Sequence, residues 1–347
     1  MDPLFSYGLA AGITLFLAHL LQPAAHHVGL IDHPTKRKRH HGPVPLVGGM
    51  AMFCGFSFGV LTVDFAIGGY RPLFAGCLLL MVVGVLDDLR ELSARDKFIA
   101  QIIAGFMMTL WGGVYLADLG QLLMPDHILT LYWFAIPFTV FALVGGINAF
   151  NMIDGIDGLA SGLAIIALAG MAWMASQAGM ANVAQLILIA LACVTAFWLL
   201  NMRFPWQAHA RIFMGDAGSM FVGFMVAWFL IVLSQGDNRA MPPVLALYLF
   251  GLPVMDTLFV FARRLASRKP PFDPDRMHIH HLALRWGIPV RWASSIILAT
   301  AAVIALLGLL AVHTGFAEST LFWTWMGLCA VYFASAHWLW QKLAKRL

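Results

Sequence analysis

Four side chains that could bind a ligand stand close together between two long apolar runs. They follow one another at three-residue steps: Asn148, Asn151, Asp154 and Asp157. A polar turn between hydrophobic helices needs a glycine and one capping side chain, and it does not need four such groups. Uncompensated polar groups are costly in hydrocarbon, so this cluster indicates a ligand, ion or substrate site. Its amide and carboxylate oxygens suit Mg²⁺, which keeps waters and bridges substrate phosphates.

The same spacing predicts the local backbone. Steps of three residues drift by about 60° each on an ideal helix, so the four side chains cannot line one narrow stripe. Gly155 and Gly158 stand among them and permit a break in the helix. We therefore expect a helix end that opens into a loop wrapping a ligand.

A pair of adjacent carboxylates, Asp87 and Asp88, closes an earlier apolar run. Adjacent residues on a helix point about 100° apart, so we expect one to face a site and the other to support it. Repulsion between the two suits a magnesium or basic-substrate environment. The alternative is a solvated helix end with Arg90 and Arg95 as ion-pair partners, and the pair alone does not decide.

Lys97 begins the next apolar run, nine residues after Asp88. It fits an anchor at the membrane surface, and it also fits a contact to phosphate. Its spacing does not distinguish these two roles.

Asp216 lies between Gly215 and Gly218 at the start of another apolar run. Small residues allow close approach of the backbone, and a helix amino terminus favours an anion or a metal-bound carboxylate. Asp216 could serve as a helix cap alone, but its glycine neighbours favour a functional role.

Three histidines, His278, His280 and His281, follow Arg276 in a basic loop. A structural zinc ion would need a further ligand such as a nearby cysteine, which the sequence lacks here. The imidazoles fit better as hydrogen-bond donors to phosphate or as orienting groups. A basic interfacial loop with incidental histidines is the alternative.

Asp256 is a carboxylate within an apolar run, and such residues are candidates for function. Arg263 and Arg264 follow one to two helical turns later. We expect structural pairing of Asp256 with these arginines.

The composition places these residues in a membrane protein. Of the 347 residues, 61% are hydrophobic and 11% are charged, and the mean hydropathy is +0.82. Soluble domains carry about 25% charged residues, so a soluble fold is excluded. The apolar runs have about the 20-residue length that crosses a bilayer. They predict an all-α polytopic bundle of about eleven transmembrane helices near 4–22, 46–64, 72–86, 98–116, 128–147, 159–178, 183–201, 217–235, 242–262, 293–313 and 319–341.

The distribution of charge predicts the orientation. Alternating loops place all but two of the 21 Lys and Arg residues, Arg71 and Arg239, on one face. The positive-inside rule makes that face cytoplasmic, with the amino terminus outside and the carboxyl terminus inside. No basic region of a cleaved signal precedes the first span, which we expect to be retained.

The chain reads as one transmembrane domain over residues 1–347, because no loop is long enough to fold alone. Four of these groups fall on the cytoplasmic face, where we expect the active site: Asp87 with Asp88, the cluster from Asn148 to Asp157, Asp216, and the histidines from His278 to His281. The longest loop should hold a short strand or an amphipathic helix. The cytoplasmic loops are expected near 23–45, 87–97, 148–158, 202–216 and 263–292.

A transporter or Mg²⁺ channel is the alternative for so apolar a chain, since polar residues can line a pathway. A transporter would place its carboxylates near the middle of the membrane and would contain inverted repeats. Here the carboxylates gather at one face and no repeat is evident. The pattern therefore favours an enzyme.

Four motifs, which are given below in chain order, make the chain resemble the polyprenyl-phosphate N-acetylhexosamine-1-phosphate transferases. These form a family of multi-span enzymes. The resemblance covers nearly the whole chain, and the histidine motif with the preceding residues 271–276 looks like the bacterial branch that uses UDP-N-acetylglucosamine and undecaprenyl phosphate. That branch starts O-antigen, enterobacterial common antigen and teichoic acid linkage units. The motifs are Asp87-Asp88, Asn148–Leu159, Phe213–Ser219 and His278–His281.

The resemblance implies a role for each candidate site residue. Asn151 and Asp216 would hold Mg²⁺, with Mn²⁺ as an alternative metal. Lys97 would meet the lipid phosphate, which Asp87 and Asp88 would activate. The remaining residues would bind the nucleotide sugar: Asn148, Asp154, Asp157, Arg276, His278, His280 and His281.

The resemblance also implies a reaction and a location. N-acetylglucosamine 1-phosphate would pass from UDP-N-acetylglucosamine to undecaprenyl phosphate, with release of UMP, at the bacterial cytoplasmic membrane. Another UDP-N-acetylhexosamine or UDP-MurNAc-pentapeptide is the alternative donor. Membrane lipids are the expected surroundings and no nucleic acid is expected. The sequence leaves the final glycan and the oligomeric state open, and a homodimer is compatible with it.

Overall fold

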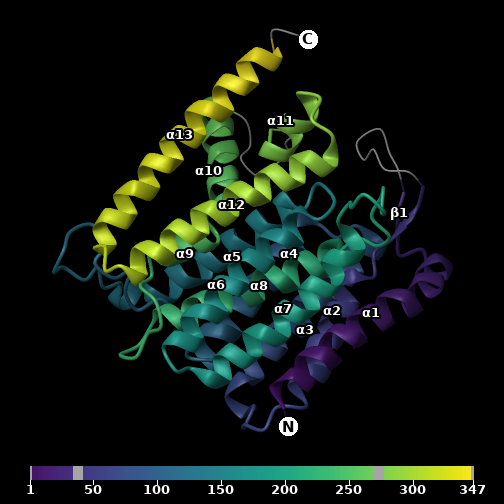
Figure 1. Ribbon diagram of the computed structural model, residues 1–347, viewed down its shortest axis with the longest axis horizontal. Helices are drawn as coiled ribbons and strands as arrows, with labels where there is room; N and C mark the ends of the chain where they lie inside the picture. The colour runs from purple at the N-terminus through teal and green to yellow at the C-terminus, as the bar shows by residue number, and fades with distance from the viewer. Residues whose placement is uncertain (1, 34–41, 269–276, 345–347) are drawn as a thin grey trace.

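A computed structural model describes residues 2–33, 42–268 and 277–344, and the apolar runs in these residues form helices (Figure 1). The α-helices are α1 (Pro3–Val28), α2 (Gly48–Val60), α3 (Arg71–Arg90), α4 (Ala94–Phe106), α5 (Ala135–Ile153), α6 (Leu159–Gln177), α7 (Ala181–Asn201), α8 (Gly215–Ser234), α9 (Leu245–Leu249), α10 (Gly251–Ala266), α11 (Ile279–Arg285), α12 (Val290–His313) and α13 (Glu318–Ala344). Short 3₁₀ helices cover Gly68–Tyr70 and Tyr132–Phe134, and a π-helix covers Met107–Trp111. The prediction of an all-α membrane fold is confirmed.

Each of the eleven predicted spans overlaps a helix, but the helices differ in their capacity to cross a membrane. α2 has 13 residues, and the chain breaks between α9 and α10 at Phe250. The count of eleven crossings therefore stays a prediction. In the part of the chain that the structure describes, seven helical segments are long and apolar enough: Pro3–Val28, Gly68–Arg90, Tyr132–Ile153, Leu159–Gln177, Ala181–Asn201, Gly215–Ser234 and Val290–His313.

The loops at the site end are shorter than the sequence indicates. α5 continues to Ile153, so Asn148 and Asn151 lie on a helix and not in the expected loop 148–158. Likewise, α3 continues to Arg90 and α4 begins at Ala94. The polar residues are therefore held mostly by helix ends, which are more rigid than loops.

α8 lies at the centre of the bundle and is almost entirely buried, whereas α1 and α12 expose most of their length (Figure 1). It packs against α2, α3, α5 and α6. A Cβ at Gly84 of α3 would overlap the backbone of Ala217, and one at Gly49 of α2 would overlap the backbone of Gly218. The missing side chains therefore let both helices touch the first turn of α8.

A small hairpin that the sequence did not predict supports the same turn. β1 (Ile31–Asp32) and β2 (Val44–Pro45) pair antiparallel. The amide of Phe213 donates to the carbonyl of Pro45 at 2.9 Å, and the amide of Gly48 donates to the carbonyl of Phe213 at 3.0 Å. The segment that leads into α8 is thus fixed from the amino-terminal side of the chain.

The two ends of the bundle carry different elements. In Figure 1, α11 and β1 lie at the end of the bundle where α13 finishes, and α1 begins at the opposite end. The expected short element in the longest loop is the helix α11. It shares a separate apolar cluster with α10 and α13, formed by Phe259, Val260, Met277, Leu282, Ala336 and Leu343.

Candidate active site

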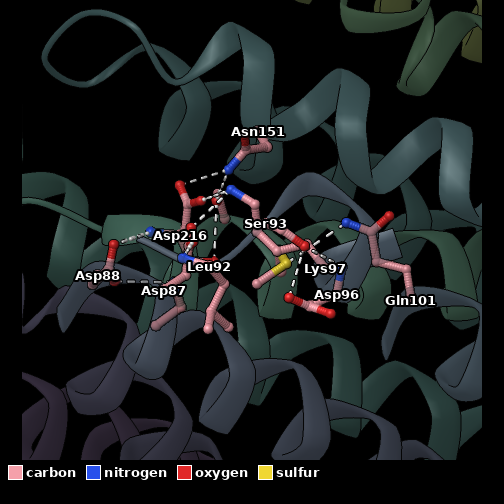
Figure 2. Close-up of polar contacts among 12 residues, drawn as sticks. Asp87, Asp88, Leu92, Ser93, Asp96, Lys97, Gln101, Asn151 and Asp216 are labelled. Atoms are coloured by element: carbon pink, nitrogen blue, oxygen red, sulfur yellow. Dashed lines mark hydrogen bonds and ion pairs between the residues drawn. The ribbon is translucent and has the colours of Figure 1, made fainter. Parts of the chain in front are cut away.

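Lys97 forms the centre of the site and joins two motifs (Figure 2). Its Nζ lies 2.8 Å from Oδ2 of Asp87 and 2.8 Å from Oδ2 of Asp216. These residues come from α4, α3 and α8. Burial would lower the pKa of Lys97, but the carboxylates of Asp216 and Asp87 raise it above its ordinary value. Lys97 is therefore a cation at neutral pH.

Asp87 and Asp88 point to different partners, as their 100° separation predicts. Oδ1 of Asp87 accepts a hydrogen bond from the amide of Leu92 at 2.7 Å, which leaves Oδ2 for Lys97. Asp88 accepts hydrogen bonds from the amides of Asp216 at 2.9 Å and Ala217 at 3.3 Å (Figure 2). Asp88 thus satisfies free amides in the first turn of α8, where the helix dipole favours a negative charge.

Asn151 approaches Asp216 from α5. Its Nδ2 lies 3.0 Å from Oδ1 of Asp216 and 2.8 Å from Oγ of Ser219. Asn148 faces a different neighbour, since its Nδ2 donates to Oε1 of buried Gln101 at 2.6 Å. The structure therefore brings Asn151, but not Asn148, into direct contact with the aspartates, and the nucleotide-sugar role of Asn148 stays a prediction.

Asn201, which sequence reasoning missed, connects the motif Asn148–Leu159, called the central motif below, to the segment before α8. Its side chain is buried, its Oδ1 accepts from the amide of Gly158 at 2.7 Å, and its Nδ2 donates to the carbonyl of Ile212 at 2.9 Å. Gly158 has a φ of 76°, which glycine adopts without strain. A lone asparagine at the end of the apolar run 183–201 was the available signal.

The two acidic residues of the central loop are placed by different contacts. Asp154 ends α5 and is half-buried. Oδ2 of Asp157 accepts a hydrogen bond from Nε of Arg203 at 2.6 Å, and its carbonyl accepts one from Oγ of Ser294 at 2.8 Å. Asp157 therefore ties the loop to neighbouring segments.

The histidine loop, defined here as residues 277–281, packs against the central loop, defined as residues 154–158. His280 is fully buried, neither of its ring nitrogens has a hydrogen-bond partner, and a Cβ at Gly155 would overlap its Nε2. Burial and the nearby His281 and His278 hold the pKa of His280 well below its ordinary range. His280 is therefore a neutral imidazole in contact with the central loop. Arg276 lies outside the described residues.

Asp256 has partners that the sequence did not reveal. Its carboxylate contacts Nδ1 of His278 at 2.7 Å, the amide of Ile279 at 2.9 Å and the hydroxyl of Tyr332 at 2.6 Å. The expectation named only the arginines that follow on α10. Partners from α11 and α13 were not predictable because they are distant in sequence.

The donor chemistry of the site suits Mg²⁺. Two carboxylates and an amide, from Asp87, Asp216 and Asn151, are oxygen ligands of the kind that Mg²⁺ prefers. The ammonium of Lys97 occupies the position between the carboxylates, which shows that a cation is stabilised there. Among the described residues, no three His, Cys, Asp or Glu side chains are already arranged as a metal cage. The donors therefore fit a magnesium ion that keeps several waters.

Fold and site together define a multi-pass membrane protein with a lysine-bridged acidic centre at one end of its helices. Residues 70–234 match the glycosyl transferase family 4. Relatives that share most of the chain also carry one common name, and the chain belongs to this family of membrane transferases.

Three relatives illustrate the likeness, and each is named an undecaprenyl-phosphate alpha-N-acetylglucosaminyl 1-phosphate transferase. The protein from Yersinia pestis is 36% identical over 82% of this chain and 77% of its own length. The protein from Escherichia coli O157:H7 is 37% identical over 87% of this chain and 82% of its own. The protein from Haemophilus influenzae is 35% identical over 89% and 86%.

Proposed function

We propose that this enzyme transfers N-acetylglucosamine 1-phosphate from UDP-N-acetylglucosamine to undecaprenyl phosphate and releases UMP. The observation that carries the proposal is the position of Lys97 between Asp87 and Asp216, at one end of a membrane-spanning bundle. The names of the relatives supply undecaprenyl phosphate and the N-acetylglucosaminyl 1-phosphate group, and the UDP-linked donor is part of the proposal. Such a site suits the meeting of a soluble nucleotide sugar with a phosphate held in the membrane.

The acceptor needs little activation by a base. A phosphate monoester has a second pKa near 6, so it is mostly dianionic at neutral pH. Two anionic substrates repel each other, and the site must supply positive charge and alignment. The Lys97 ammonium supplies charge for the lipid phosphate, and Asp87 holds that ammonium in place.

In the reaction, an oxygen of the lipid phosphate attacks the β-phosphorus of the donor, and the bond from that phosphorus to the oxygen bridging the two phosphates breaks. UMP leaves with that oxygen. Asp88 fixes the first turn of α8, and Asn151 orients Asp216. Magnesium bound by Asp216 and Asn151 would neutralise charge on the pyrophosphate. We assign Asp154, Asp157 and the histidine loop to the wall that receives the sugar and the nucleotide.

The location follows from the same reaction. Undecaprenyl phosphate is a membrane lipid, and the basic residues gather on the face that also carries the site. We place the protein in the bacterial cytoplasmic membrane with its site on the cytoplasmic side. Its product would start a cell-surface polysaccharide such as O-antigen, enterobacterial common antigen or a teichoic acid linkage unit.

Washed membranes containing the protein test the proposal. Given labelled UDP-N-acetylglucosamine, undecaprenyl phosphate and Mg²⁺, they should form a labelled lipid and an equal amount of UMP. EDTA should stop the reaction, and added Mg²⁺ or Mn²⁺ should restore it. UDP-N-acetylgalactosamine and UDP-MurNAc-pentapeptide serve as competing donors. Failure to release UMP from any of these donors would contradict the enzyme assignment.

A further inference from the structure

Asp256 is a buried carboxylate outside the acidic centre of Asp87, Lys97 and Asp216. Within the part of the chain that the structure describes, it has three hydrogen-bond partners around the histidine loop. It is 1% exposed. Oδ2 faces Nδ1 of His278, and Oδ1 accepts from the amide of Ile279 and the hydroxyl of Tyr332. A buried charge with this many donors is held in a fixed position.

The chemistry of these partners determines which ring nitrogen of His278 carries the hydrogen. An ionised carboxylate only accepts hydrogen bonds, so Nδ1 of His278 must be the donor. That arrangement fixes the ring orientation and leaves Nε2 as the nitrogen available to another group. The ring of His278 lies parallel to that of His280, with centroids 5.9 Å apart, and His280 contacts Gly155 of the central motif. The position of His278 therefore bears on the whole histidine loop.

The last helix contributes to this arrangement from outside the acidic centre. Tyr332 belongs to α13, and its ring packs edge-on against Phe259 of α10, with centroids 6.1 Å apart. Leu282 of α11 is buried in the same apolar cluster as Phe259. The cluster holds α10, α11 and α13 together, and the Tyr332 hydroxyl adds a directional bond to Asp256.

We propose that Asp256 is a positioning residue that sets the orientation and tautomer of His278, and that Tyr332 makes the last helix part of this device. The proposal rests on the proposed transferase function, in which the histidine loop contacts the donor. α13 thereby contributes to turnover without a residue in the acidic centre.

Two single substitutions test the device in washed membranes. Asp256→Asn leaves an amide N–H facing hydrogen donors, and kcat should fall about 10- to 100-fold. Tyr332→Phe keeps the ring and removes one hydrogen bond, and kcat should fall about three- to tenfold. In both variants the KM for undecaprenyl phosphate should stay within about twofold of wild type, because Lys97 is untouched.

Tyr248→Phe is the matched control. The hydroxyl of Tyr248 is buried and donates to the carbonyl of Leu321 on α13 at 2.7 Å, away from the histidine loop. Its loss weakens the attachment of the same helix but leaves Asp256 unchanged, so kcat should stay near that of wild type. An equal fall in kcat for Tyr248→Phe and Tyr332→Phe would mean that α13 acts only by general stabilisation, and would overturn the proposal.

A double-mutant cycle separates positioning from an independent role. If Asp256 acts through His278, then Asp256→Asn should lower kcat no further in a His278→Ala background. If the two effects multiply, the proposal is wrong. Tyr332→Phe in the same background repeats the comparison should Asp256→Asn fail to fold. If the wild-type protein is active and the effects of the two substitutions on kcat multiply, only the positioning role of Asp256 is rejected. If the wild-type protein is inactive, the proposed transferase function is rejected.

Discussion

Nζ of Lys97 and Oδ2 of Asp216 lie 2.8 Å apart, although 119 positions separate these residues in the sequence. The contact joins the start of α4 to the first turn of the most buried helix. Lys97 therefore points toward Asp87 and Asp216, and its contact with the lipid phosphate stays a prediction.

Replacing Lys97 should therefore impair turnover. Lys97→Met keeps most of the side-chain volume but leaves Asp87 and Asp216 without their shared cation, and kcat/KM for undecaprenyl phosphate should fall at least about 100-fold. Arg95→Gln is the control, since Arg95 is exposed on the same helical turn. Near-normal kcat/KM in Lys97→Met would show that the ammonium does not act on the acceptor.

Asp87 and Asp88 should give different defects when each is changed to asparagine. Both variants should lose activity, but Asp88→Asn also weakens the two hydrogen bonds at the start of α8. It should lower the free energy of unfolding by about 1–2 kcal/mol more than Asp87→Asn does. Thermal unfolding in detergent measures the difference, and equal unfolding midpoints would contradict the assignment of Asp88 as support for α8.

Gly155→Ala should displace the histidine loop. The new methyl group would overlap the ring of His280, which is fully buried and cannot move freely. We expect a loss of stability of about 1–3 kcal/mol and a reduced kcat. In Gly145→Ala, on the preceding helix α5, the added Cβ would meet no atom within 4 Å. The control should behave as wild type, and matching behaviour of both variants would argue against close contact between the loops.

Acid should destabilise the fold through His280. Its pKa is lowered in the folded state by burial, so the unfolded chain takes up a proton near pH 6.5 that the folded chain does not. The stabilisation is complete above about pH 6.5 and declines by at most about 1.4 kcal/mol per pH unit below it. Unfolding measured from pH 7.5 to 5 should show a smaller decline in His280→Leu. Parallel curves for the two proteins would mean that folding leaves the pKa of His280 unchanged, against the lowering expected from its burial.

The sequence predicts the helices well because the length of an apolar run is a local property. Helix ends are harder to predict, because they depend on partners elsewhere. α5 extends past Asn148 and Asn151 since Gln101 and Ser219 on neighbouring helices accept hydrogen bonds from these amides. The two-residue strands β1 and β2 are likewise too short to have a sequence pattern of their own.

The site is predictable in its components and less so in its contacts. The motifs identify Asp87, Asp216 and Asn151, and helical geometry predicts that one of Asp87 and Asp88 faces elsewhere without saying which. Nothing in the sequence pairs Asp256 with Tyr332, because a tyrosine in an apolar helix is ordinary. Partners of this kind are determined by how the helices cross.

The backbone contacts at Gly49 and Gly84 have a consequence for changing the specificity of the enzyme. They press two helices directly onto the turn that carries Asp216, so a larger residue at either position would shift the carboxylates themselves. Directed evolution toward another sugar should therefore find few tolerated changes at this helix junction. Productive substitutions should gather instead in the loops that surround it, where a new side chain can alter the shape offered to the sugar while the phosphate chemistry stays in register.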